Sequence, residues 1–175
     1  MIKLGARIAA VALTGLVAAC TVQPVYVPAT PEAGAKVSAL RSIYIEPVND
    51  RVSQRVRNEL IFLFNGGSAQ SDEPEYELDL TVSKRNKKVL VVLTDLDGEP
   101  TASTVKITVN YRLTRVSDDT IIGNHRTSGS ASYDLTNQEY ANIRAERDAE
   151  NRAARDVAER LRALIATDLK RAGAL

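Results

Sequence analysis

Hydrophobic and polar residues alternate most regularly over residues 104–113, and this alternation predicts a β-strand with one buried face. The apolar positions of this stretch are Val105, Ile107, Val109, Tyr111 and Leu113. The polar positions between them are Thr104, Lys106, Thr108, Asn110 and Arg112. Burial of each large apolar side chain contributes roughly 1.5 to 3 kcal/mol before conformational entropy is subtracted. We therefore expect this strand to supply much of the core, and the opposite face of its sheet to remain polar.

Two further strands are predicted on the N-terminal side of this one. A short β-rich run lies at residues 42–48 and is ended by a proline. Strict alternation over residues 76–82 predicts a half-buried strand, which a basic stretch at residues 84–88 interrupts before the apolar run 89–93. Either one long strand bulges here or the chain reverses tightly. We favour the bulge because the interruption has no glycine turn signal.

Turn signals mark the connections to the remaining strands. Asp97-Gly98 is typical of a hairpin turn between the long strand and the regular one. Ser117-Asp118-Asp119 predicts a second turn. A last strand, rich in small and hydroxylated residues, is then expected over residues 120–133.

An amphipathic helix is predicted between the first two strands. Asn49 or Asp50 is a suitable N-cap, and Gly66-Gly67 supplies the end. The apolar positions recur at intervals of three and four: Val52, Val56, Leu60, Leu63 and Phe64. Most of the other surface of this helix is polar, so it has one face to bury.

A long final helix is predicted over residues 137–171. Thr136 and Glu139 have the spacing of a capping box, and Gly173 supplies a stop. The apolar positions form a stripe: Tyr140, Ala149, Ala153, Val157, Leu161, Leu164 and Ile165. The remaining surface carries charges of both signs. This pattern indicates either a solvated helix with i to i+4 ion pairs or a surface that fills a wet cavity in a partner.

The predicted elements follow one another in the order β-α-β-β-β-α. Each helix has one apolar side and the sheet has one strongly apolar face. We therefore predict an α+β fold of two layers, with two helices packed on a four-stranded sheet that is mixed or mostly antiparallel. The first strand, helix and second strand form a right-handed crossover unit.

The first 20 residues have the pattern of a bacterial lipoprotein signal. Lys3 and Arg7 precede an apolar run that ends at Leu16-Val17-Ala18-Ala19-Cys20, where two small residues stand before a cysteine. In such signals the thiol is alkylated with diacylglycerol, the chain is cut before the cysteine, and the new amino terminus is acylated. The sequence therefore predicts that Cys20 is lipidated.

The expected domain organisation follows from this signal. Residues 1–19 are the lipoprotein signal peptide, residues 20–41 a lipidated flexible tether with three prolines, and residues 42–175 a single domain. Thr21 stands where an aspartate would favour retention in the inner membrane. An outer-membrane location is therefore expected.

The residue types that catalysis and metal binding require are scarce. Cys20 is the only cysteine and His125 the only histidine, so we expect no metal site, no cofactor and no enzymatic activity. His125 is interpreted as a polar residue of a sheet or turn. Removing Lys3 and Arg7 from the 23 basic residues leaves 21 against 22 acidic ones. This near-neutral balance argues against a nucleic-acid partner.

One basic cluster, formed by Lys84, Arg85, Lys87 and Lys88, has two interpretations. Lysines and arginines on a strand deter edge pairing and keep a protein soluble. Alternatively, they contact phosphates or acidic sugars of an amphipathic lipid, together with Lys106 and Arg112 of the neighbouring strand.

Several short segments, in their order along the chain, resemble one protein family. They are Val17-Ala18-Ala19-Cys20 with Pro24-Val25-Tyr26, the run 43–51 leading into Arg57-Asn58-Glu59-Leu60, Tyr76-Glu77-Leu78, Tyr111-Arg112-Leu113, Ser132-Tyr133 and Tyr140-Ala141. This order, over nearly the whole mature chain, is similar to that of the LptE family of lipopolysaccharide-assembly lipoproteins.

The resemblance implies an outer-membrane lipoprotein, anchored by its lipid on the periplasmic side, with two helices on a four-stranded sheet. It implies that the domain plugs the β-barrel LptD, helps that barrel to assemble, and supports lipopolysaccharide transport and insertion without catalysis. On this basis we assign Lys84, Arg85, Lys87 and Lys88 to contact with lipopolysaccharide. An alternative function is that of a periplasmic scaffold or activator lipoprotein acting on cell-wall or secretion machinery.

Overall fold

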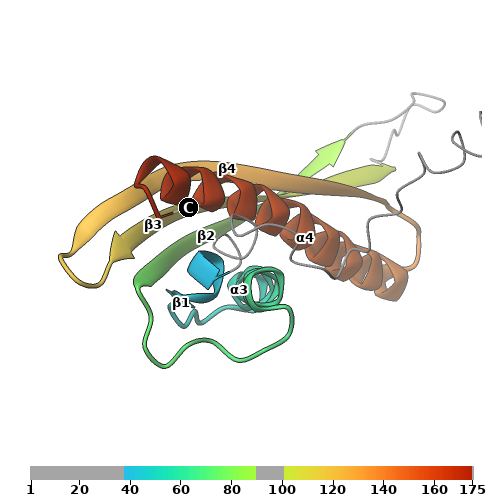
Figure 1. Cartoon of the computed structure of the whole chain (residues 1–175). Coiled ribbons are helices and arrows are strands. Elements are labelled where there is room, and N and C mark those ends of the chain that lie inside the picture. The colour runs from blue at the N-terminus through green and yellow to red at the C-terminus, as the bar shows by residue number, and fades with distance from the viewer. Residues whose placement is uncertain (1–37, 90–100, 175) are drawn as a thin grey trace, which may run out of the picture. The chain divides into compact units, whose positions relative to one another are not determined.

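The computed structural model describes residues 38–89 and 101–174 of the chain (Figure 1). After a helical turn at residues 38–41, the elements follow in the predicted order β-α-β-β-β-α. They are β1 (Ile43–Ile45), α3 (Arg51–Asn65), β2 (Tyr76–Val89), β3 (Ala102–Arg115), β4 (Thr120–Asp134) and α4 (Glu139–Arg171). The α+β class predicted from the sequence is confirmed.

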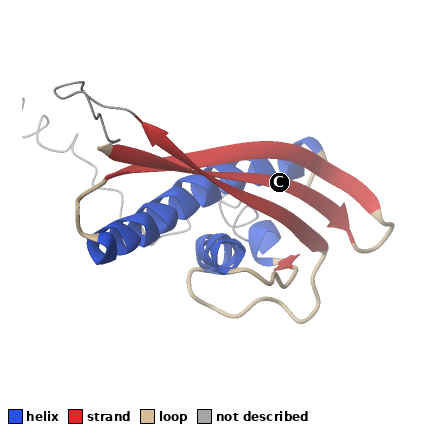
Figure 2. Cartoon of the chain, turned by 180° about the vertical axis from the view of Figure 1, so that it is seen from behind, coloured by secondary structure: helices blue, strands red, loops and turns tan. Residues whose placement is uncertain are grey.

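The four strands form one mixed sheet in the order β1-β2-β3-β4. β1 runs parallel to β2, because α3 connects them as a crossover, and the other neighbours are antiparallel. Both helices cover the same face of the sheet. Figure 2 shows the strands in front of α4 when the molecule is seen from behind. The sheet therefore has one covered face and one open face.

The core lies between the helices and the covered face of the sheet. Its fully buried side chains include those that the alternation in β3 predicts, together with residues from every other element except β4. The largest of them are Tyr111, Ile43, Ile45, Leu60, Leu78, Ile107, Leu113, Leu161, Ile165 and Leu169. The open face carries Lys106, Asn110 and Arg112, all exposed, so the prediction of a polar opposite face is confirmed.

The predicted bulge at residues 84–88 is wrong. β2 pairs with β3 without a register shift from Tyr76 to Val89, because the polar side chains of this stretch keep the alternation of a regular strand. The one shift in these ladders lies between β3 and β4, at Leu113 and Thr114. The apolar run beyond Val89 and the predicted Asp97-Gly98 turn lie outside the described residues.

The caps of α3 agree with the sequence. Asp50 Oδ1 accepts hydrogen bonds from the backbone N–H groups of Val52 and Ser53, and Gly66 ends the helix with a φ of 62°. Burial opposes ionisation of Asp50, but the hydrogen bonds from Ser53 and Val52 outweigh it and lower the pKa of this carboxyl group. Asp50 therefore caps the helix as a carboxylate.

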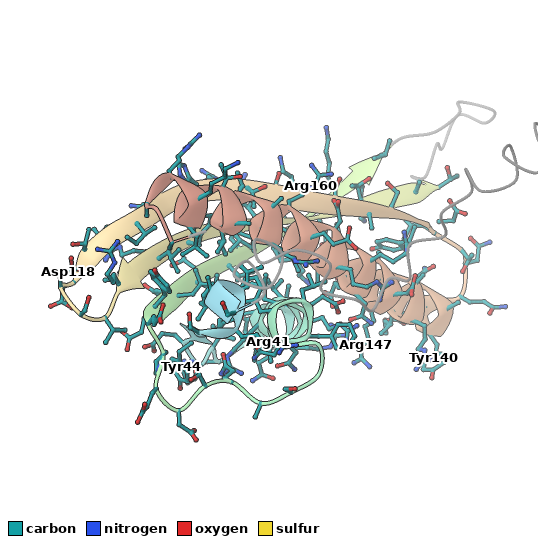
Figure 3. The ribbon with its side chains drawn as sticks, in the orientation of Figure 1. Arg41, Tyr44, Asp118, Tyr140, Arg147 and Arg160 are labelled. Atoms are coloured by element: carbon teal, nitrogen blue, oxygen red, sulfur yellow. The ribbon has the colours of Figure 1, made fainter. Side chains whose placement is uncertain are left out.

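The start of α4 differs from the prediction. Gln138 is the N-cap and makes no side-chain cap bond, so Thr136 and Glu139 do not form a capping box. The side chain of Asn142 instead bonds both backbone groups of Thr136. Tyr140, predicted in the apolar stripe, is 74% exposed at this end of the helix (Figure 3). Gly173, with a φ of 73°, follows the helix end as predicted.

Candidate functional site

The structure divides the predicted basic cluster between the two faces of β2. Residues directly opposite one another in neighbouring strands share a face. Lys84 and Lys88 are opposite Ile107 and Ser103, which are buried beneath the helices. The other two members, Arg85 and Lys87, are opposite Lys106 and Thr104 and lie on the open face. The four residues therefore do not form one patch.

Lys84 is held by two glutamates of α4. Its Nζ lies 2.6 Å from Glu150 Oε1 and 3.2 Å from Glu146 Oε1. The Glu150 side chain is only 8% exposed, and it also forms an ion pair with Arg51 at the start of α3. Asn86 Nδ2 donates to Glu146 at 2.6 Å. This network ties β2, α3 and α4 together at one end of the core.

The network shifts the pKa values of its members in opposite directions. The hydrogen bond to Glu150 raises the pKa of Lys84 above its ordinary value of 10.5, against the effect of burial. The hydrogen bond from Asn86, helped by Lys84, lowers the pKa of Glu146 below 4.5. Stability gained from Glu146 is present above its ordinary pKa and is lost as the pH falls through its folded value. Stability gained from Lys84 is present below 10.5 and is lost as the pH rises through its folded value.

Replacing Lys84 with methionine is expected to lower the free energy of unfolding by about 1 to 2 kcal/mol at pH 7, because Glu150 keeps only Arg51. The difference from the native chain should be largest between about pH 5 and pH 10 and shrink outside that range, which urea unfolding at several pH values measures. Lys88→Met is the matched control, since Lys88 forms no ion pair with the described residues. Equal losses in both variants would contradict the network.

The open face carries five exposed cations that form no ion pair within the described residues. They are Arg85, Lys87, Lys106, Arg112 and Arg126. Arg85 and Lys106 are directly opposite each other in the β2–β3 ladder. Like charges in such a pair are destabilising, so this arrangement favours an anionic group between them. Glu77 and Asp79 lie on the same face, and Asp79 is directly opposite Arg112 without forming an ion pair with it.

Hydroxyl groups fill much of the open face between these charges. They belong to Thr81, Ser83, Thr104, Thr108, Ser128, Ser130 and Ser132. Hydroxyls donate and accept hydrogen bonds, and arginine and lysine donate to phosphate or carboxylate oxygens. The open face can therefore bind a molecule with both sugar and acidic groups, or pack against a polar protein surface.

Sequence reasoning placed Lys106 and Arg112 beside this site but missed Arg126. The register brings Arg126 opposite Asn110, diagonally next to Arg112. β4 contains few apolar side chains, so its alternation gave no sign of which residues face the helices. The glycines could have identified the face that packs on the helix, because a glycine allows close approach. Gly129 lies against the α4 backbone, so the residues on either side of it face the open side.

His125 belongs to a separate, structural cluster at the C-terminal end of α4. Its Nε2 lies 3.2 Å from Oδ1 of the buried Asp168, and the Tyr111 hydroxyl donates to Asp168 Oδ2 at 2.5 Å. Burial, and then the bond to Asp168, raise the pKa of Tyr111. Gly123 lies against the Asp168 carboxylate, where a Cβ would collide with it. His125 is thus a polar sheet residue, as interpreted from the sequence.

Two further observations apply to residues 38–89 and 101–174. No three side chains of the metal-binding types His, Cys, Asp and Glu are grouped there as they would be around a metal ion. Neither of the two long helices combines the length and apolar character needed to cross a bilayer. Cys20, the predicted lipidation site, lies outside the described residues.

Comparison with known proteins adds the following. A family model described as LptE, Lipopolysaccharide-assembly, matches residues 40–165. A comparison with curated protein sequences finds no match. Among solved structures, a protein described as a lipoprotein from Caulobacter crescentus CB15 is 25% identical, with a TM-score of 0.63 over 79% of this chain and 97% of that one.

Two more distant solved structures share the fold. A minor lipoprotein from Acinetobacter baumannii is 14% identical, with a TM-score of 0.52 over 72% of this chain and 89% of that one. Rare lipoprotein B from Shewanella oneidensis is 13% identical, with a TM-score of 0.50 over 73% of this chain and 95% of that one.

Proposed function

Since this chain belongs to the LptE family of lipopolysaccharide-assembly proteins, we propose that it occupies the lumen of the outer-membrane β-barrel LptD and supports lipopolysaccharide insertion there. It acts without catalysis, as a lipoprotein attached through Cys20 to the periplasmic side of the outer membrane. The diacylglyceryl and acyl chains keep the domain beside the barrel, because two or more chains give stable anchoring where one does not.

The open sheet face is the observation that carries this proposal. In an unbound domain, five cations without an ion pair among the described residues would all face solvent on this side of the sheet. The interior of a large membrane barrel is polar, and a charged, hydroxyl-rich surface suits it. The mixed charges on the outer side of α4 suit the same environment.

Lipopolysaccharide is the anionic ligand that we propose for the open face. Arg85 and Lys87 of the predicted cluster lie there with Lys106, and their charges are available to phosphates or acidic sugars. Lys84 is engaged by Glu146 and Glu150, and Lys88 lies on the other side of the strand. The proposal therefore assigns direct contact to Arg85 and Lys87, with Lys84 positioning the strand.

A combined variant, Arg85→Gln, Lys87→Gln and Lys106→Gln, is expected to weaken binding of the full-length chain to purified lipopolysaccharide at least about tenfold. Each substitution removes a cation from the open face without touching the core. Binding is measured by titration at two salt concentrations, and the native chain should lose more affinity in high salt than the variant.

The control variant removes the same charge from α4 through Arg155→Gln, Arg162→Gln and Lys170→Gln. These three exposed residues form no ion pair in the described part of the chain. Binding close to that of the native chain is expected. If both variants weaken binding equally, attraction is non-specific and the open face is not the binding site.

A further inference from the structure

β4 is the last strand of the sheet, and its outer edge has no neighbouring strand among the described elements. Alternate residues of an edge strand direct their N–H and C=O groups away from the sheet. Two contacts show which residues these are in β4. The N–H of Ser130 donates to Asp156 Oδ2 at 3.3 Å, and the C=O of Ser132 accepts from Arg152 Nη2 at 2.8 Å. The even-numbered residues therefore face the edge.

The same alternation identifies the groups that remain available. Asn124, Arg126 and Ser128 direct their N–H and C=O groups outwards, and no side chain of the described residues bonds them. Two side chains of α4 close the edge only at Ser130 and Ser132. The outward backbone groups of three residues therefore remain available for hydrogen bonds, over a stretch of five consecutive residues.

β4 lacks two of the features by which proteins protect such an edge. It is 15 residues long and contains no proline and no lysine. Its one register shift lies before Gly123, so the stretch from Asn124 to Ser128 pairs regularly with β3. The edge is therefore geometrically suited to pair with another strand.

α4 lies directly beneath this edge. A Cβ atom on Gly129 would stand 2.7 Å from both Ala153 O and Val157 N, so the helix backbone touches the strand. The side chains that reach the edge belong to ion pairs along α4, Asp148 with Arg152 and Asp156 with Arg160. An added strand would rest on these charged side chains.

We propose that the β4 edge between Asn124 and Ser128 accepts a single extended segment of a partner protein, which extends the sheet by one strand. Backbone hydrogen bonds supply the affinity, as in other cases of strand addition. Partner side chains opposite Arg126 lie on the open face beside it. Since neither Arg126 nor its neighbour Arg112 forms an ion pair with the described residues, an acidic residue is favoured at that position.

A second copy of this chain is a poorer occupant of the edge than a lone strand. Two β4 strands paired about a two-fold axis would lie about 4.8 Å apart, whereas packed helices need about 8 to 10 Å between their axes. Each copy brings an α4 whose backbone touches its own β4 at Gly129, so the two helices would crowd each other beneath the joined edges. The occupant is therefore a strand without a helix beneath it.

This inference deepens the proposed function, on which it rests for the partner's identity, but the two are separable. The full-length chain is purified with its partner from envelope membranes in mild detergent, and also alone. Hydrogen–deuterium exchange is then compared at single residues. The amides of Arg126 and Ser128 are expected to exchange at least about tenfold more slowly in the complex. Unchanged exchange at both amides would overturn the proposal.

Matched proline variants give a second measurement. Ser128→Pro removes an N–H from the proposed pairing segment, while Ser132→Pro removes an outward N–H from the same strand beyond it. We expect Ser128→Pro to retain at least about tenfold less partner than Ser132→Pro. Equal retention by the two variants, with both folded, would also overturn the proposal.

Mass spectrometry of the same complex separates the two ideas. A barrel partner without amide protection leaves the proposed function standing and ends the edge assignment. A different partner with amide protection supports the edge assignment and contradicts the proposed function. A chain that is purified without any partner contradicts both the proposed function and the edge assignment.

Discussion

Replacing Gly129 with valine is expected to lower the free energy of unfolding by about 3 kcal/mol, among the largest effects of any single change in the described domain. The side chain would point from β4 into the backbone of α4, where even a Cβ meets Ala153 O and Val157 N at 2.7 Å. Backbone atoms on both elements cannot move aside as a side chain does. Helix and strand must therefore separate, which opens the core beside Ile107, the residue opposite Gly129.

Denaturant unfolding followed by circular dichroism measures this loss. Ser130→Val is the control, since Ser130 is the next residue of the same strand and faces the open side. Its effect should stay within about 0.5 kcal/mol, because valine suits a strand and meets no helix there. If both variants were equally stable, α4 would not lie against β4 at this position.

Loss of the lipid anchor should have the largest effect on location. When residues 1–20 are replaced by an ordinary cleaved export signal, the domain is expected to move almost completely from the membrane to the soluble envelope fraction. The physical reason is that each buried CH₂ group contributes about 0.8 kcal/mol to membrane attachment, and the anchor is lost with Cys20. Fractionation and the mass of the N-terminal peptide measure the change.

Thr21→Ala, which leaves Cys20 in place, is the control and should remain in the membrane fraction with a lipid-modified N-terminal peptide. A native chain whose Cys20 carries no lipid, or an anchorless chain that still sediments with membranes, would contradict the predicted anchor.

The sequence predicts the covered face of the sheet well, because burial imposes a period of two on β3. The alternation predicts a strand at residues 104–113, and β3 is two residues longer at each end, from Ala102 to Arg115. The caps of α3 are equally local, since Asp50 and Gly66 act on their own helix. Each of these features depends on neighbours in the chain.

Features that depend on distant partners were not visible in the sequence. Lys84 and Asn86 interrupt the apolar pattern of β2, which suggested a bulge, but Glu150 and Glu146 of α4 bond them from 66 and 60 residues away. The start of α4 was mispredicted for a local reason, since the side chain of Asn142, six residues along the chain, bonds the backbone of Thr136 in place of a capping box.

The candidate site was predicted only in part for the same reason. Closeness in sequence grouped Lys84, Arg85, Lys87 and Lys88, yet successive side chains of a strand point to opposite faces. The open-face cations come from three strands, and only the register of the β3–β4 ladder brings Arg126 next to Arg112. That register is fixed by packing of α4 on β4 and not by any local pattern.

Photocrosslinking in living cells tests most directly whether this domain works inside a barrel. A photoreactive amino acid replaces Lys106 at the centre of the open face or Arg162 on the exposed side of α4, and the captured peptides are identified by mass spectrometry. The proposed function predicts that both positions capture residues of the LptD barrel that face its lumen. Capture only of inner-membrane or cell-wall proteins, or no capture from either position in a chain that is correctly anchored, would contradict it.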